Sequence, residues 1–530
     1  MNIKTNSKIL NEIIDGLAMA LIGIFCFLYS RFCSEFAKIN LKLNSLTFPL
    51  FVGELLLIAC IFLLLLKFAV SPIKLNKWHW VLFGWILFIA AKALYGYHFY
   101  GALAFRNAAL FYYSSFAIAT YYFFNIPLLK RKLTHYLILS ILLISLLLRL
   151  PIPYYIYSCI ILSLVLILSL KNKLLRYSLI ALFVLVLPYK SLFGVSRAGL
   201  LAHFAAWIFL FIVFLLMFNL KFKYKIYASL LFFLFSLAFI YLFVDPNNIK
   251  SLLNLKVVLD RYKEYKCQYV GIKQKYGYQE SVIPVLLYED ALHKQLEAVH
   301  KKDIVLNEEL KKFNAEINQK KETTVNEKNK TLSVSRYISA PGNRSNVLAA
   351  QELKSLDNDI KTTGLKDAED FKKNKKYRSL NTAYSNIVWR MIVYSDMWED
   401  IINEKRVFGA DFGKPFRSKT IETLGWNNAG QWVGWIEPHN SYIHILYRAG
   451  VIGILFIFVL ISLFIWLVKN FVKLHDIKGI LLSSALVYWL IFPNFAVVLE
   501  LPYFAIPFWC LFGITLRYAH HKIYSISSQI

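Results

Sequence analysis

The chain alternates between long apolar runs and short polar gaps. Apolar runs of about 18–24 residues recur along it, and each is long enough to cross a hydrocarbon core of roughly 30 Å. We expect twelve membrane spans, at residues 12–30, 47–69, 78–96, 102–124, 133–150, 153–170, 173–189, 198–219, 224–244, 441–468, 478–498 and 502–518. The pattern therefore predicts an all-α polytopic membrane protein with about 12 transmembrane helices.

Lysine and arginine gather in every second gap, and this alternation predicts the topology. The basic gaps hold Lys4 and Lys8, Lys74 and Lys77, Lys130 to Lys132, Lys171 to Arg176, Lys221 to Lys225, Lys469 to Lys478, and Arg517 to Lys522. The gap 97–101 has no Lys or Arg, and the only charged residue of 499–501 is Glu500. Basic gaps face the cytoplasm, so both termini are expected inside and the long segment 245–440 outside. The first gap, with Arg31, fits this alternation least well.

Three regions follow from this pattern: residues 1–244 hold spans one to nine, 245–440 form a periplasmic loop, and 441–530 hold spans ten to twelve. Within the loop, 260–380 is rich in Lys, Glu and Asn. Apolar spacing at 286–321 and 345–361 predicts a charged helical hairpin there, and a partly disordered insertion is the alternative. Residues 384–440 are rich in Trp, Gly and other aromatics, and we expect them to form an ordered catalytic cap on the membrane.

Composition narrows the class of protein further. The 530 residues are 58% hydrophobic and carry a net charge of +28. Such a charge invites a nucleic-acid partner, but it is split among short clusters between spans, so we expect a membrane and no nucleic acid. Six cysteines form no CxxC pair, which makes a metal or disulfide framework improbable. The first apolar run lacks a small-residue cleavage site and is interpreted as a retained helix.

Three motifs carry residues suited to chemistry at the outer face. The first is Ser196-Arg197-Ala198-Gly199 at the start of the eighth span. The second is an amphipathic helix over 386–404 with Trp389, Arg390 and Tyr394, closed by a glycine turn at 408–413. The third is Glu437-Pro438-His439-Asn440-Ser441 at the start of the tenth span, where Asn440 or Ser441 is suited to cap the helix. Taken singly, each has a structural alternative: an arginine at lipid phosphate, a snorkelling arginine, and a cap with an incidental histidine.

Together, in this order around one large loop, the motifs resemble the O-antigen ligase superfamily of membrane glycosyltransferases. The resemblance covers the span count, the loop position, and residues 190–205, 384–416 and 435–455. The charged insertion 260–380 departs from the family pattern and leaves the branch open.

The resemblance implies a reaction and roles for its residues. The donor is a glycan on undecaprenyl diphosphate, the acceptor is a sugar hydroxyl of lipid A-core or of another glycan, and transfer inverts the anomeric carbon outside the bacterial inner membrane, with no cofactor and no metal. Arg197 and Arg390 are then expected to stabilise the leaving diphosphate. His439 is expected to accept the proton of the attacking hydroxyl. Residues expected to bind substrate are Ser196, Arg106, Tyr394 and Asn440.

Several alternatives stay open at this point. O-antigen ligation is favoured by a small margin over polysaccharide polymerisation, and ligation to protein is a third branch. A flippase or transporter for lipid-linked sugar is the rival of another class, and broken helices with charges in several spans would favour it. Lower-ranked residues are expected to be partners of Arg106 or interfacial (Lys92, Arg149, Glu54, Glu500), to support packing (His203, His444, Arg448), or to be solvated surface (Asp357 to Asp359).

Overall fold

The computed structural model describes residues 3–41, 50–71, 77–124, 132–147, 153–180, 197–217, 227, 262–263, 375–423 and 438–527. The chain divides into two compact units. The first comprises Met1–Phe243, Tyr394–Phe416 and Glu437–Ile530, and the second comprises Val244–Val393 and Arg417–Ile436. The predicted hairpin in 260–380 and the predicted span 224–244 fall almost wholly outside the described residues.

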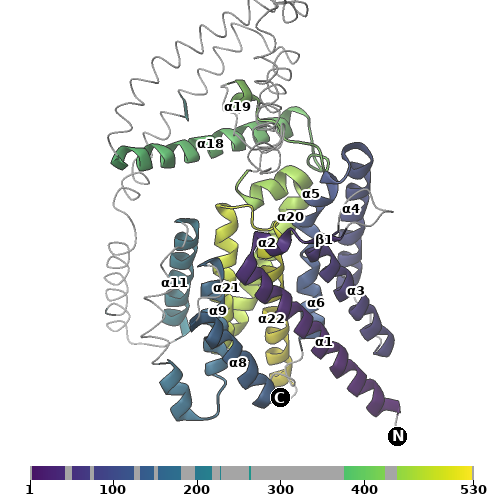
Figure 1. Cartoon of the computed structure of the whole chain (residues 1–530), viewed down its shortest axis with the longest axis vertical. Coiled ribbons are helices and arrows are strands. Elements are labelled where there is room, and N and C mark those ends of the chain that lie inside the picture. Colours follow the sequence, from purple (N-terminus) through teal and green to yellow (C-terminus); the bar gives the residue numbers. More distant parts are fainter. Residues whose placement is uncertain are drawn as a thin grey trace, which may run out of the picture. The chain divides into compact units, whose positions relative to one another are not determined.

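The first unit is a bundle of helices (Figure 1). The helices described in this unit include α1 (Ile3–Phe32), α2 (Ser34–Ala37), α3 (Val52–Val70), α4 (Lys77–Tyr100), α5 (Leu103–Tyr112), α6 (Ser115–Phe123), α8 (Lys132–Leu147), α9 (Pro153–Ile167), α11 (Arg197–Met217), α20 (Ser441–Lys473), α21 (Ile477–Ile491), the 3₁₀ helix η2 (Phe492–Asn494) and α22 (Pro502–Ser527). Two short antiparallel strands, β1 (Asn40–Leu41) and β2 (Leu50–Phe51), pair Asn40 with Phe51. Helix α18 (Lys375–Asn403) runs from the second unit into the first, and α19 (Lys419–Thr423) lies in the second.

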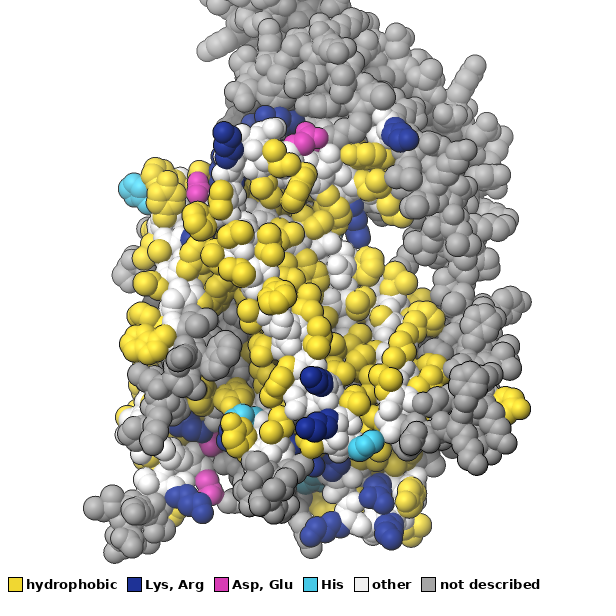
Figure 2. All heavy atoms as spheres, turned by 180° about the vertical axis from the view of Figure 1, so that it is seen from behind, with side chains coloured by type: hydrophobic (Ala, Val, Ile, Leu, Met, Phe, Trp, Pro, Cys, Tyr) yellow, Lys and Arg dark blue, Asp and Glu magenta, His cyan; other side chains and the backbone are white. Residues whose placement is uncertain are grey.

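Among the described residues, five helices are long and apolar enough to cross a membrane: Ser7–Phe32, Val52–Val70, Ala198–Met217, Ser441–Lys473 and Ile477–Asn494. Hydrophobic side chains cover most of the middle of one face of the bundle, and most of its charged side chains lie toward the two ends (Figure 2). A water-soluble bundle would hide such a surface. The protein is therefore consistent with an all-α membrane protein, as the sequence predicts.

Helix α21 lies at the centre of the bundle and packs against α9, α11, α20 and α22. Its Trp489 is buried, and the indole donates a hydrogen bond to Ser158 Oγ of α9 at 2.7 Å. Helix α22 approaches α6 through Gly513, where an added Cβ would lie 2.2 Å from the carbonyl oxygen of Ala117. Only glycine permits this contact, so these two helices pack backbone against backbone.

The run predicted as one span over 102–124 is two short helices, α5 and α6. Between them the backbone tightens into 3₁₀ hydrogen bonds, from Ser114 N to Phe111 O and from Phe116 N to Tyr113 O, each at 3.0 Å. Neither Pro nor Gly marks this interruption, so an apolar pattern alone could not reveal it. Beside it, Glu54 Oε1 accepts hydrogen bonds from the hydroxyls of Tyr112 (2.5 Å) and Tyr113 (2.8 Å).

Candidate active site

The start of α20 places the predicted histidine in an unusual backbone conformation. His439 has φ of 50°, in the left-handed region that non-glycine residues seldom adopt. Its side chain is half-buried, between the buried residues Pro438 and Asn440. Asn440 caps the helix, because its side-chain oxygen accepts hydrogen bonds from Tyr442 N (3.0 Å) and Ile443 N (3.1 Å). The predicted cap is confirmed, and the imidazole stands immediately before it.

Ser441 fixes this helix start to the turn between α21 and α22. Its hydroxyl oxygen accepts from Val498 N at 2.8 Å and from Leu499 N at 3.1 Å, and the hydroxyl donates to Ala496 O at 3.2 Å. Ser441 itself is fully buried. The first turn of α20 is thereby held against a second part of the chain, which restricts the movement of His439.

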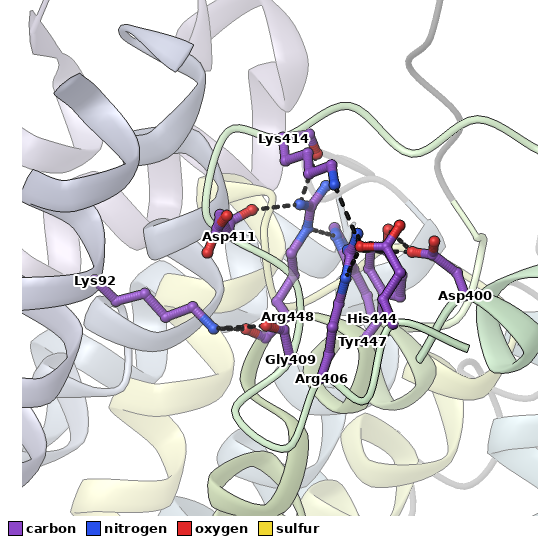
Figure 3. A network of polar contacts seen from close by, with 10 residues as sticks. Lys92, Asp400, Arg406, Gly409, Asp411, Lys414, His444, Tyr447 and Arg448 are labelled. Atoms are coloured by element: carbon purple, nitrogen blue, oxygen red, sulfur yellow. Dashed lines mark hydrogen bonds and ion pairs between the residues drawn. The ribbon is translucent and has the colours of Figure 1, made fainter. Parts of the chain in front are cut away.

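One and two turns further along α20, the buried His444 and Arg448 are hydrogen-bonded to each other (Figure 3), and His444 also contacts the buried Glu500, which comes from the segment before α22. Arg448 Nε donates to His444 Nε2 at 3.1 Å, and His444 Nδ1 contacts Glu500 Oε1. Because Nε2 accepts a hydrogen bond, the single imidazole proton lies on Nδ1 and is donated to Glu500. A neutral imidazole therefore joins a buried guanidinium to a buried carboxylate.

The same arginine holds a loop of the cap. Arg448 Nη1 donates to the carbonyl oxygens of Asp411 (2.8 Å) and Lys414 (2.7 Å). Between these carbonyls the chain turns at Gly413, whose N–H donates to Asn107 Oδ1 of α5 at 2.7 Å. The loop 405–416 is thus fastened to α20 on one side and to α5 on the other.

Helix α20 is broken at Gly450, and the loop 405–416 supplies hydrogen-bond partners for backbone groups at the break. Gly450 has φ of 55° and ψ of −129°, which only glycine tolerates readily. In place of helical hydrogen bonds, Val451 N donates to Val407 O at 2.9 Å, and Ala410 N donates to Tyr447 O at 2.7 Å. The Lys92 ammonium of α4 donates to Arg448 O at 2.5 Å. Backbone groups released by the break are therefore satisfied by the loop and by α4.

A hydrogen bond and ion pairs join the end of α18 to α20 and to the loop 405–416. Asp400 accepts from Tyr447 OH at 2.7 Å and pairs with Arg406 Nη1 at 3.1 Å. Arg406 also binds Glu404, and this hydrogen bond lowers the pKa of the Glu404 carboxyl. The predicted helix 386–404 is the final part of α18, which ends at Asn403, and the predicted glycine turn follows it.

The remaining predicted site residues are distributed as follows. Arg197 is the first residue of α11, and Ser196 lies outside the described residues. Arg106 is on α5 and is exposed. Arg390 and Tyr394 are half-buried on α18, with Arg390 in the second unit and Tyr394 in the first. The grouping of Arg197, Arg390 and His439 around one donor stays a prediction.

From the sequence, His444 and Arg448 were expected to support packing, and Lys92 and Glu500 were expected to be partners of Arg106 or interfacial residues. In the structure Glu500 contacts His444, and Lys92 binds main-chain carbonyls. Asn107 and Asp400 were not singled out, although a buried asparagine in an apolar run is a signal that could have been used. Within the described ranges, no three His, Cys, Asp or Glu side chains are placed to hold a metal ion.

Comparisons of the chain with known protein families, with curated proteins and with solved structures find no match.

The break at Gly450 gives a direct test of this local structure. A Cβ at this position would lie 2.0 Å from Val407 O and 2.6 Å from Gly409 N. Gly450→Ala is therefore expected to lower the free energy of unfolding by about 1–3 kcal/mol for the strained backbone alone. Gly84→Ala on α4, where an added Cβ meets no atom within 4 Å, is the matched control. Thermal unfolding in mild detergent measures both, and equal midpoints for the two variants would contradict the described junction.

Proposed function

We propose that the protein is a membrane glycosyltransferase that moves a glycan from undecaprenyl diphosphate to a sugar hydroxyl. The observation that carries the proposal is the start of α20, where a half-buried histidine in a strained conformation precedes a capped and pinned helix. Strained, over-determined backbone is concentrated at functional sites. Here the strained residue is His439, to which the family resemblance gives the role of general base.

In the proposed reaction, the acceptor oxygen forms a bond to the anomeric carbon as the bond from that carbon to the diphosphate oxygen breaks. His439 accepts the proton of the acceptor hydroxyl. Undecaprenyl diphosphate leaves, and its growing negative charge is stabilised by Arg197 and Arg390. Arg106, Tyr394, Asn440 and Ser196 are proposed to bind substrate. The side-chain oxygen of Asn440 accepts the helix-cap hydrogen bonds, and its side-chain NH2 group is proposed to bind the substrate.

We place the protein in the bacterial inner membrane, with twelve spans and with the start of α20 facing the periplasm. The basic gaps of the sequence support this orientation. Ligation of O-antigen to lipid A-core is the favoured reaction, and polymerisation by the same chemistry is the alternative.

The glycan profile of a deletion strain tests the proposal. For a ligase, capped lipid A-core disappears and the lipid-linked donor accumulates. For a polymerase, a single repeat stays on the core. An unchanged profile, with normal levels of lipid-linked donor, contradicts both forms of the proposal.

A transporter for lipid-linked sugar is the second candidate, because two predicted spans depart from a continuous helix: 441–468 breaks at Gly450, and 102–124 tightens between α5 and α6. The α5–α6 interruption lies next to Glu54, and ionisable groups within spans often serve transport. For a transferase, Glu54→Gln should retain transfer within about threefold, since the amide oxygen still accepts the tyrosine hydroxyls. For a transporter, the same change should abolish flipping of a fluorescent lipid-linked sugar in proteoliposomes. Glu35→Gln, an exposed acidic residue of α2, is the control.

A further inference from the structure

The end of α18 and the loop that follows it expose large apolar side chains. Trp398 and Ile402 lie four residues apart and so share one side of the helix. Val407 and Phe408 follow at the tip of the loop, and their side chains are 61% and 59% exposed. These four residues are called the apolar edge. Ala410 and Phe412 of the same segment are buried, so the exposed large hydrophobic side chains between Tyr394 and Phe416 are those of the edge.

The tip of this edge is fixed at a definite level of the bundle. Val451 N of α20 donates to Val407 O at 2.9 Å, and the Lys92 ammonium of α4 contacts Phe408 O. Val407 and Phe408 therefore lie between α4 and α20. Val451 is also the first exposed residue of α20, because the residues from Ser441 to Gly450 are buried or half-buried.

From this level onward, α20 presents apolar side chains to its surroundings. The exposed large side chains are Val451, Ile454, Leu455, Phe458, Val459, Ile461, Leu463, Ile465 and Trp466. Lys469 is the first exposed basic residue after them. About 20 helical residues cover about 30 Å, the thickness of a hydrocarbon core. If one boundary of that core lies near Lys469, the other lies near Val451, beside the apolar edge.

We infer that the apolar edge is seated in the membrane interface and that its partner is the phospholipid bilayer. Val407 and Phe408 contact acyl chains, continuing the exposed apolar surface of α20. Trp398 and Ile402 lie among the headgroups, where tryptophan is favoured. The exposed residues between the two pairs are the polar Asn403 and the charged Glu404 and Lys405, and all three suit the headgroup layer. This inference does not depend on the proposed reaction.

Photo-crosslinking in the complete chain tests the inference. A benzophenone amino acid replaces Phe408, and the purified protein is placed in vesicles of phosphatidylethanolamine and phosphatidylglycerol. After illumination, phospholipid adducts are measured by mass spectrometry. Two positions calibrate the result. Ile454, on the exposed apolar surface of α20, gives the yield among acyl chains. Asn403, an exposed polar residue that points about 100° away from Ile402 around the helix, gives the yield at the headgroup layer.

The yield of lipid adducts at Phe408 is expected to match that at Ile454 and to exceed that at Asn403 several-fold. Val407 offers a second position if the probe at Phe408 lowers the yield of folded protein. Yields at both loop positions no higher than at Asn403, with a high yield at Ile454, would overturn the inference. The same probe is also illuminated in native membranes. If Phe408 there forms an adduct with another protein in place of lipid, the inference is overturned as well.

Discussion

Arg448→Met is expected to destabilise the protein by about 3–5 kcal/mol, because it leaves a buried carboxylate without its compensating charge. Arg448, His444 and Glu500 are each at least 95% buried, with exposed fractions of 2%, 3% and 4%. Removing the guanidinium also takes the donor from the carbonyls of Asp411 and Lys414. The loop 405–416 should then separate from α20, in addition to the loss of global stability.

Two measurements check this expectation. The unfolding midpoint in mild detergent should fall, and trypsin should cut faster after the exposed Lys405 and the half-buried Arg406. Lys469→Met removes an exposed charge from the same helix and should change stability by about 0.5 kcal/mol or less. The double variant Arg448→Met with Glu500→Gln should be less destabilised than the sum of the two single changes. Additive effects would show that the two charges are not coupled through His444.

The sequence predicted the parts of this region that depend on local pattern. Asn440 was expected as a cap from residue type and position, and the amphipathic helix was expected to end near residue 404 before a glycine turn. Both follow from short-range rules, because a cap needs a side-chain oxygen at the helix start and a turn with positive φ favours glycine. Local pattern also supported membrane-spanning helices, since length and apolar character are properties of each run.

Contacts between distant segments could not be predicted in the same way. His444 and Arg448 are four residues apart, a spacing that puts both on one face of a helix, but Glu500 joins them from another segment. The repair of the α20 break is a stronger case. The sequence around Gly450 does not indicate that Val407 and Ala410 supply the missing helical hydrogen bonds. Those contacts depend on how the loop 405–416 packs against α20. The full span count and the relation of Arg390 to His439 stay predictions.

The largest effects on activity are expected at the three residues assigned to the reaction. Arg197→Ala and Arg390→Ala should each lower glycan transfer by about 10²–10³-fold, the usual cost of losing one preorganised donor to developing charge. Lysine at either position should restore little activity, because an ammonium cannot reproduce the two parallel hydrogen bonds of a guanidinium. Lys405→Ala removes an exposed cation outside the proposed site and should leave transfer unchanged.

His439 allows chemistry to be separated from backbone strain. His439→Ala should lower transfer by about 10²–10⁴-fold if the imidazole is the general base, but alanine also disfavours φ of 50°. His439→Gly adopts that conformation without steric strain and should lose transfer equally, with donor binding retained. Transfer is measured in membranes with matched protein levels. If the glycine variant keeps normal transfer, His439 is a conformational residue and not the base. If both arginine variants also keep it, the assignment of the diphosphate site fails, and with it most of the case for a glycosyltransferase.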